Sequence, residues 1–252
     1  RYALGLEFSF MNEEGLVAIR QIPREISLND GQIRNIGEVK DLEFEESVET
    51  KQAKEREALI AIYDALDGDN WKKKKNWCSE RPVNEWYGVD TDENSFVTKL
   101  HICGNLNKLA ERVTLPTEIE CLKNLSSLWL EMTNVDSFPD VMTSLNIKEF
   151  TSSQNPYLTL FEYEPVYDGA GALEVFDIFL STGSSYDISD QIKISQPIPS
   201  ELLKNKDLKT LRLEGCNLSG NIPSWIGELT ALKSLTLYNL WTTNMTGEIP
   251  ST

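Results

Sequence analysis

The chain has 252 residues, of which 40% are hydrophobic and 25% charged, a composition typical of a folded protein with a sizeable core. Its formal net charge of -16 argues against nucleic acid or an anionic lipid surface as a partner, because like charges repel at close range. The most apolar stretch, residues 58–63, is far shorter than the roughly 18 residues that cross a bilayer.

The first 46 residues alternate hydrophobic and polar side chains around turn signals such as Asn29-Asp30-Gly31, which predicts short β-strands. The strand candidates are residues 4–10, 17–19, 26–28 and 39–44. So few strands are marginal as an independent fold. We therefore expect residues 1–46 to be the end of a β-rich domain that begins upstream of Arg1.

Residues 47–96 are expected to form a linker helix and a cap. Hydrophobic side chains at helical spacing predict a helix over residues 51–66, with Gly68 as its C-terminal cap. The cap then carries three tryptophans, Trp71, Trp77 and Trp86. We interpret them as cover for the end of a core, and the alternative is a platform on which sugars stack.

Residues 97–252 contain a hydrophobic pattern of the form L-x-x-L-x-L six times. The copies begin at Val97, Leu125, Ile147, Leu173, Leu208 and Leu232. A strand turns alternate side chains to opposite faces, so that each copy has an apolar side that only neighbouring copies can bury. The third copy is weak because Ser152 stands at an apolar position. The pattern predicts an α/β solenoid, a right-handed, curved stack of short parallel strands.

A proline follows several of these strands after an apolar residue. The pairs are Leu115-Pro116, Phe138-Pro139, Ile198-Pro199 and Ile222-Pro223. Proline fixes φ and lacks an amide donor, which suits a turn onto the convex side of the stack.

These motifs resemble a known family. Residues 208–229 resemble the plant-specific class of leucine-rich repeat, and residues 58–66 with the three tryptophans resemble the N-terminal cap of bacterial surface leucine-rich-repeat proteins. The resemblance covers about residues 55–252 and implies a location outside the cell or on its surface. Caps of the plant type pair two cysteines, but this chain matches only Cys78 and has Thr91 at the second position.

The period of two predicts which side chains face the concave surface. The central row reads His101, Trp129, Thr151, Asp177, Arg212 and Thr236, and the next row reads Cys103, Glu131, Ser153, Phe179, Glu214 and Tyr238. Large aromatic side chains and arginine often anchor interfaces. The candidate binding residues are therefore Trp129, Glu131, Asp177, Phe179, Arg212 and Tyr238. The alternative is that loops fold over the aromatic side chains.

Six strands about 4.8 Å apart span only about 24 Å, too little for a standard protein interface. Irregular insertions after the strands are expected to enlarge the binding edge, and they carry four further candidates, Tyr163, Tyr167, Tyr186 and Trp241. The alternative is that the insertion after the third copy merely covers that weak repeat.

Catalytic motifs are absent from the sequence, which has a single histidine, His101, and no C-x-x-C pair. The sequence thus predicts a non-enzymatic recognition module with no cofactor and no metal. Its partner is expected to be a protein bound through the concave face and edge insertions, or a glycan stacked on the aromatic insertions. A purely structural spacer is the third alternative. We further expect no transmembrane segment, and a lipid anchor upstream of Arg1 stays open.

Overall fold

The structure is a computed structural model that describes residues 6–11, 16–22, 45–105, 112–155, 158, 160–169, 171–179, 195–239 and 244–248. Its fold divides the chain into two compact units, residues 1–54 and 55–252, and each is considered by itself. The predicted boundaries at residues 46 and 96 stay a prediction.

The first unit contains a small antiparallel sheet. Its strands are β1 (Leu6–Met11), β2 (Leu16–Ile22) and β3 (Glu45–Glu46), in the order β1-β2-β3. β1 and β2 confirm the strands expected at residues 4–10 and 17–19. The candidates at 26–28 and at 39–44 lie outside the described residues.

The helix α1 (Val48–Ala65) begins three residues earlier than predicted. The Ser47 hydroxyl oxygen accepts a hydrogen bond from the Thr50 amide at 3.1 Å, which satisfies one of the free donors at the helix start. The expected apolar stripe is buried: Leu59, Ile62, Tyr63 and Leu66. The expected cap at Gly68 is wrong, because the left-handed residue after the helix is Asp67, with φ of 55°. Gly68 instead lies against the Tyr63 ring, where a Cβ would overlap the ring atoms.

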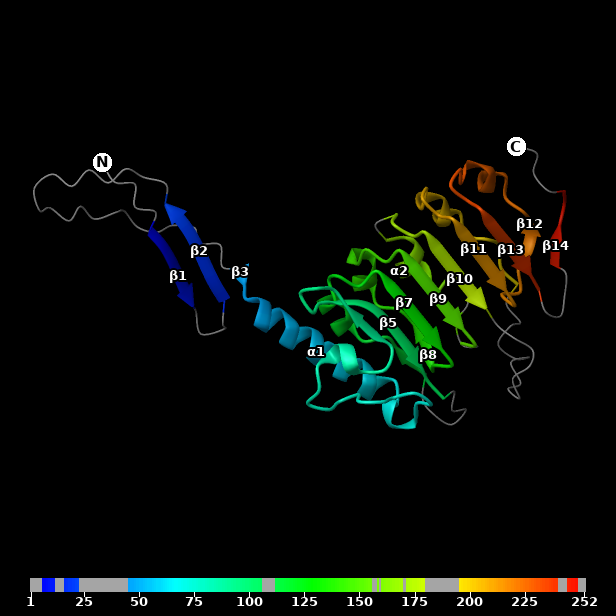
Figure 1. The fold of residues 1–252 in the computed structure, drawn as a ribbon. Helices are drawn as coiled ribbons and strands as arrows, with labels where there is room; N and C mark the ends of the chain where they lie inside the picture. Colours follow the sequence, from blue (N-terminus) through cyan, green and yellow to red (C-terminus); the bar gives the residue numbers. More distant parts are fainter. Residues whose placement is uncertain are drawn as a thin grey trace, which may run out of the picture. The chain divides into compact units, whose positions relative to one another are not determined.

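The second unit is built on a seven-stranded sheet. Six strands carry the six sequence copies: β5 (Val97–Cys103), β7 (Ser127–Glu131), β9 (Glu149–Ser153), β10 (Val175–Phe179), β11 (Thr210–Glu214) and β13 (Ser234–Tyr238). They pair in parallel in chain order (Figure 1). The strand β4 (Val89–Thr91) pairs with β5 in the antiparallel direction. The sheet is open, with β4 and β13 at its edges. The predicted α/β solenoid is therefore confirmed.

The apolar positions of the repeat lie in register and form the core. One row runs through Leu100, Leu128, Phe150, Phe176 and Leu211, all of them buried. The last copy is less covered, and Leu235 on β13 is 40% exposed. β13 has a neighbouring strand on one side only, so its apolar side chains have fewer partners.

Short turns return the chain from one strand to the next. The turns that follow the marker prolines are the 3₁₀ helices η3 (Thr117–Cys121), η4 (Asp140–Ser144), η5 (Ser200–Lys204) and η6 (Ser224–Glu228). Each begins directly after its proline, which confirms the predicted turns. The short helix α2 (Glu164–Tyr167) follows β9, and two small parallel pairs complete the return segments: β6 (Val113–Thr114) with β8 (Val135–Ser137), and β12 (Ser219–Asn221) with β14 (Asn244–Thr246).

The cap includes the 3₁₀ helices η1 (Gly68–Asn70) and η2 (Val83–Glu85) and encloses an aromatic cluster. Its rings are those of Tyr63, Trp71, Trp77 and Trp86, with neighbouring ring centroids 5.0 to 5.8 Å apart. The three tryptophans are buried, and each indole N–H donates to a backbone carbonyl. Their structural interpretation is confirmed, because buried rings offer no platform to a sugar.

A buried carboxylate links the cap helix to the first repeat. Glu55 is 2% exposed, and its Oε2 accepts a hydrogen bond from the Val97 amide at 2.8 Å. Burial raises the pKa of Glu55 from its ordinary 4.5 to about 7, against the lowering effect of that hydrogen bond. Among the described residues, no helix combines the length and hydrophobicity needed to cross a membrane.

Candidate functional site

The side chains that point away from the core define what we call the open face of the sheet. The strand register aligns its central row as predicted: His101, Trp129, Thr151, Asp177, Arg212 and Thr236. It likewise aligns the neighbouring row of Cys103, Glu131, Ser153, Phe179, Glu214 and Tyr238. Because both rows depend only on the period of two and on parallel in-register pairing, the sequence sufficed to predict them.

One end of the open face carries a ladder of rings. The imidazole of His101 stacks on the indole of Trp129, with centroids 3.9 Å apart and planes inclined by 5°. The Tyr87 ring lies 5.9 Å from His101, and the Lys73 ammonium lies 5.4 Å above Tyr87. The ladder therefore begins in the cap and ends at Trp129, which is 41% exposed.

Glu131 holds the histidine of this ladder. Its Oε2 lies 3.3 Å from Nε2 of His101. Burial lowers the pKa of His101 below its ordinary 6.5, although the hydrogen bond to Glu131 opposes that shift. His101 is thus mainly neutral at pH 7 and is a poor counter-charge for Glu131, whose nearby cation is Lys73 of the cap.

A second cluster occupies the middle of the open face around Arg212. Its guanidinium lies 2.6 Å from Glu214 Oε2, 3.8 Å from Asp177 Oδ2 and 4.4 Å from the centre of the Phe179 ring. Phe179 is half-buried under that guanidinium, so the exposure expected for it is reduced by a neighbour on the same face. Burial raises the pKa of Asp177, and Arg212 only partly opposes the shift.

Tyr238 on β13 is the most exposed aromatic side chain of the open face, at 53%. It lies four strand steps from Trp129, which is about 19 Å at the usual strand spacing. The open face thus exposes one large aromatic group near each end, with charged side chains between them.

The insertion after β9 contradicts part of the predicted site. Tyr163 and Tyr167 are 1% and 2% exposed and pack on Phe176 in the core, so they are wrong as contact residues. They cover the weak third repeat, which was the alternative interpretation of this segment. Within the described part of the insertion, the aromatic side chain that is exposed is Phe161, at 55%. Tyr186 and Trp241 lie outside the described residues.

Two residues of the ring ladder were missed by sequence reasoning. Tyr87 and Lys73 belong to the cap. They reach the open face because the cap strand β4 pairs with β5 and because the backbone of Lys73 forms an isolated antiparallel β-bridge with Cys103. The only signal for Tyr87 was its place directly after Trp86, shortly before the first repeat. His101 was placed in the correct row, but its stacking on Trp129 was not expected.

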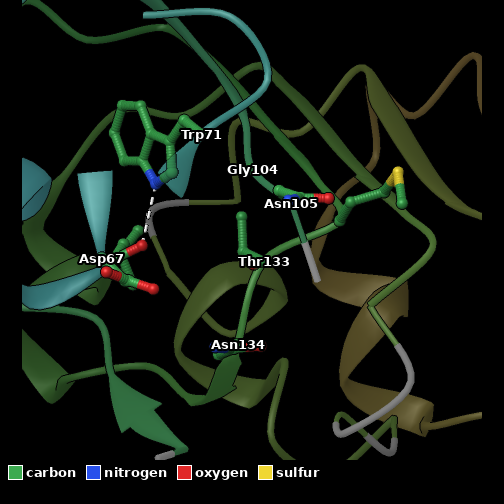
Figure 2. A pocket seen from close by; sticks show the side chains of 8 residues that line it. Asp67, Trp71, Gly104, Asn105, Thr133 and Asn134 are labelled. Carbon is green, nitrogen blue, oxygen red and sulfur yellow. Dashed lines mark hydrogen bonds between the residues drawn. The ribbon is translucent and has the colours of Figure 1, made fainter. Parts of the chain in front are cut away.

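Figure 2 shows a pocket between the cap and the loops that follow β5 and β7. Its lining comes from Leu66, Asp67, Trp71, Gly104, Asn105, Met132, Thr133 and Asn134. It has room for about one water molecule, far below the volume of an organic ligand. Asn134 Oδ1 is buried there without a hydrogen-bond partner in the described structure. We therefore place the candidate site on the open face.

The described residues bring no three histidine, cysteine or carboxylate side chains together as a group that could hold a metal ion. The four cysteines, Cys78, Cys103, Cys121 and Cys216, form no disulfide bonds. Burial raises the pKa of the Cys78, Cys103 and Cys216 thiols, which disfavours the reactive thiolate form. The chemistry that the open face offers is stacking, ion pairing and hydrogen bonding.

The parallel in-register repeats, the proline turns and the capped end define a solenoid of the leucine-rich-repeat type. A plant ice-binding protein has a similar structure, with a TM-score of 0.56 and 21% identity over 79% of this chain and 58% of that one. This chain therefore spans less than two thirds of that protein. A leucine-rich-repeat protein of Bacteroides thetaiotaomicron (TM-score 0.48, 12% identity, 80% of this chain and 40% of that one) and the SOBIR1 receptor-kinase ectodomain of Arabidopsis thaliana (0.43, 18%, 77% and 95%) are also similar. No protein-family model and no curated protein sequence matches the chain.

Proposed function

We propose that this protein is a non-enzymatic recognition module that binds a partner protein through the open face of its repeat sheet. The observation that carries the proposal is the exposure of Trp129 and Tyr238 on that face, at 41% and 53%. Large exposed aromatic groups are costly in water, and they anchor interfaces when a partner covers them. Charged groups between the two anchors supply orientation and specificity.

The two other functions suggested by the sequence have weaker support. A glycan site was expected on the tyrosine-rich insertions, but Tyr163 and Tyr167 are buried. A structural spacer needs no exposed aromatic groups on its sheet, so it leaves Trp129 and Tyr238 unexplained.

Location outside the cell belongs to the same proposal and is supported by the resemblance of the cap and the repeats to surface proteins. Protease treatment of intact cells that make the protein tests it. Digestion of the protein without digestion of a cytosolic control supports an outside location, and full protection of the protein contradicts it.

A photo-crosslinking amino acid at position 129 or 238 tests the binding face. The matched control carries the same group at Phe161, which is equally exposed but lies outside the rows of the open face. We expect positions 129 and 238 to capture the same protein from cells that make this chain, and position 161 not to capture it.

The captured protein is then purified, and its dissociation constant is measured for the wild type and for the variant Trp129→Ala/Tyr238→Ala. The proposal predicts at least a tenfold weaker complex with the variant, and no change for Phe161→Ala. Equal affinities for wild type and double variant would place the interface elsewhere and overturn the proposal.

A further inference from the structure

Among the residues that the structure describes, the ring ladder of the open face leaves one side of Trp129 without an aromatic neighbour. His101 on β5 covers the indole face that is turned toward β5. On the other side of β7 the same row continues with Thr151 on β9 and Asp177 on β10. The small side chain of Thr151 therefore occupies the row position beside Trp129 at which a further ring could stack. We call this place the open position, bounded by Trp129, Thr151 and Asp177.

The width of the open position is set by the sheet. β7 and β10 are two strand steps apart, which is about 9.6 Å. One compact planar or cationic group, in van der Waals contact with the indole, fills most of that space above Thr151. A cation held there lies between an aromatic face and a carboxylate, and each of them attracts it.

The charges around the open position favour a cation. A third outward row precedes the two already described and consists of Lys99, Ser127, Glu149, Val175, Thr210 and Ser234. Together the three rows carry the carboxylates Glu131, Glu149, Asp177 and Glu214, against the cations Lys99 and Arg212 of the rows and Lys73 of the cap. Arg212 lies closer to Glu214 than to Asp177, at 2.6 Å against 3.8 Å. Asp177 Oδ1 is buried without a hydrogen-bond partner in the described structure. The negative charge beside Trp129 is thus only partly compensated.

We propose that the partner protein inserts a lysine or arginine side chain into the open position. This inference rests on the proposed function and names the chemistry of its partner. The basic group would stack on Trp129 and pair with Asp177. Tyr238 lies about 19 Å from Trp129, so an extended partner segment with an apolar side chain about six residues away from the basic residue would reach both anchors.

A display library of random dodecapeptides, selected on the intact chain, provides the probe. The selected peptides are synthesised, and their dissociation constants are measured for the wild type and three variants. Asp177→Asn removes the charge, Thr151→Phe fills the open position, and Ser234→Phe adds the same ring at an exposed outward position of β13. Replacing the peptide's basic residue with norleucine or glutamine removes the ligand charge.

The proposal predicts peptides with a conserved lysine or arginine. Asp177→Asn, Thr151→Phe and loss of the peptide's charge should each weaken binding about tenfold, and Ser234→Phe should change it less than twofold. Loss of the peptide's charge and Asp177→Asn should not add, because both remove the same contact.

The contrary outcomes separate the two proposals. Peptides that depend on Trp129 and Tyr238 but need no basic residue would overturn this inference and leave the proposed function standing. Peptides insensitive to every substitution on the open face would count against both. If a glycan array instead gives ligands that Thr151→Phe displaces, the occupant is a saccharide and the inference is wrong.

Discussion

The hydroxyl groups of Ser152 and Tyr163 lie 2.7 Å apart in the core of the third repeat. Ser152 stands at a position that the repeat gives to an apolar side chain, and its oxygen also accepts a hydrogen bond from Asn155 Nδ2 at 2.8 Å. The tyrosine from the insertion therefore both fills space beside a small residue and satisfies its polar group. This pair explains why the insertion after β9 folds onto the core.

The Ser152–Tyr163 pair should be energetically coupled. We expect Tyr163→Phe to lower the free energy of unfolding by about 1 kcal/mol and Ser152→Ala by about 2 kcal/mol, because the second change removes one hydrogen bond from the Tyr163 hydroxyl and one from Asn155 Nδ2. The double variant should lose about 1 kcal/mol less than the sum of the single variants. Denaturant unfolding of the four proteins measures this, and strictly additive losses would argue against the coupling.

Glu55 should make stability depend on pH. Its pKa is raised from 4.5 to about 7, so its contribution is fully present below pH 4.5 and is lost as the pH rises through 7. Glu55→Gln keeps an acceptor for the Val97 amide but carries no charge. We expect the variant to match the wild type at pH 4 and to exceed its unfolding free energy on the order of 3 kcal/mol at pH 8. A difference that does not change between pH 4 and 8 would contradict the raised pKa.

Gly88 should tolerate no side chain. Its φ is 78°, and a Cβ there would overlap the carbonyl oxygen of His101 on β5. Gly220 has nearly the same φ, 75°, with open space around the Cβ position, so it isolates the cost of the backbone conformation. We predict a loss of about 1–2 kcal/mol for Gly220→Ala and a clearly larger loss for Gly88→Ala. Thermal unfolding compares the two, and equal losses would show that the contact with His101 is not tight.

The cap and the open face should respond differently to loss of a tryptophan. Trp77 is buried in the aromatic cluster, so Trp77→Ala should cost about 3–5 kcal/mol of unfolding free energy. Trp129→Ala removes an exposed ring and should cost less than about 1 kcal/mol. Urea unfolding measures both changes. A large loss with Trp129→Ala would assign that ring to stability rather than to binding.

The repeat and its consequences could be predicted from local pattern. Alternation along each copy and parallel pairing determine both outward rows, and the proline after each apolar residue determines where a 3₁₀ turn begins. These features depend on neighbouring residues and on one repeated geometry. The placement of Trp129 and Tyr238 on the open face followed from them without any knowledge of distant contacts.

The insertion and the cap could not be predicted in the same way. Whether Tyr163 faces water depends on a gap that Ser152 leaves in the core, and no period in the sequence encodes that contact. The helix end at Asp67 was missed because the Tyr63 ring uses the space that Gly68 leaves free. Arg212 lies over Phe179 because its side chain adopts one of the several conformations that are open to it on the open face of the sheet. In each case tertiary packing decided between local alternatives.

Hydroxyl-radical footprinting of the complex with the captured partner tests the binding face most directly, because it reads the exposure of individual aromatic side chains. In the free protein Trp129, Tyr238 and Phe161 should all be oxidised rapidly, as their exposed fractions require. Binding should protect Trp129 and Tyr238 at least fivefold and leave Phe161 unchanged. Protection of Phe161 with continued oxidation of Trp129 and Tyr238 would contradict recognition through the open face.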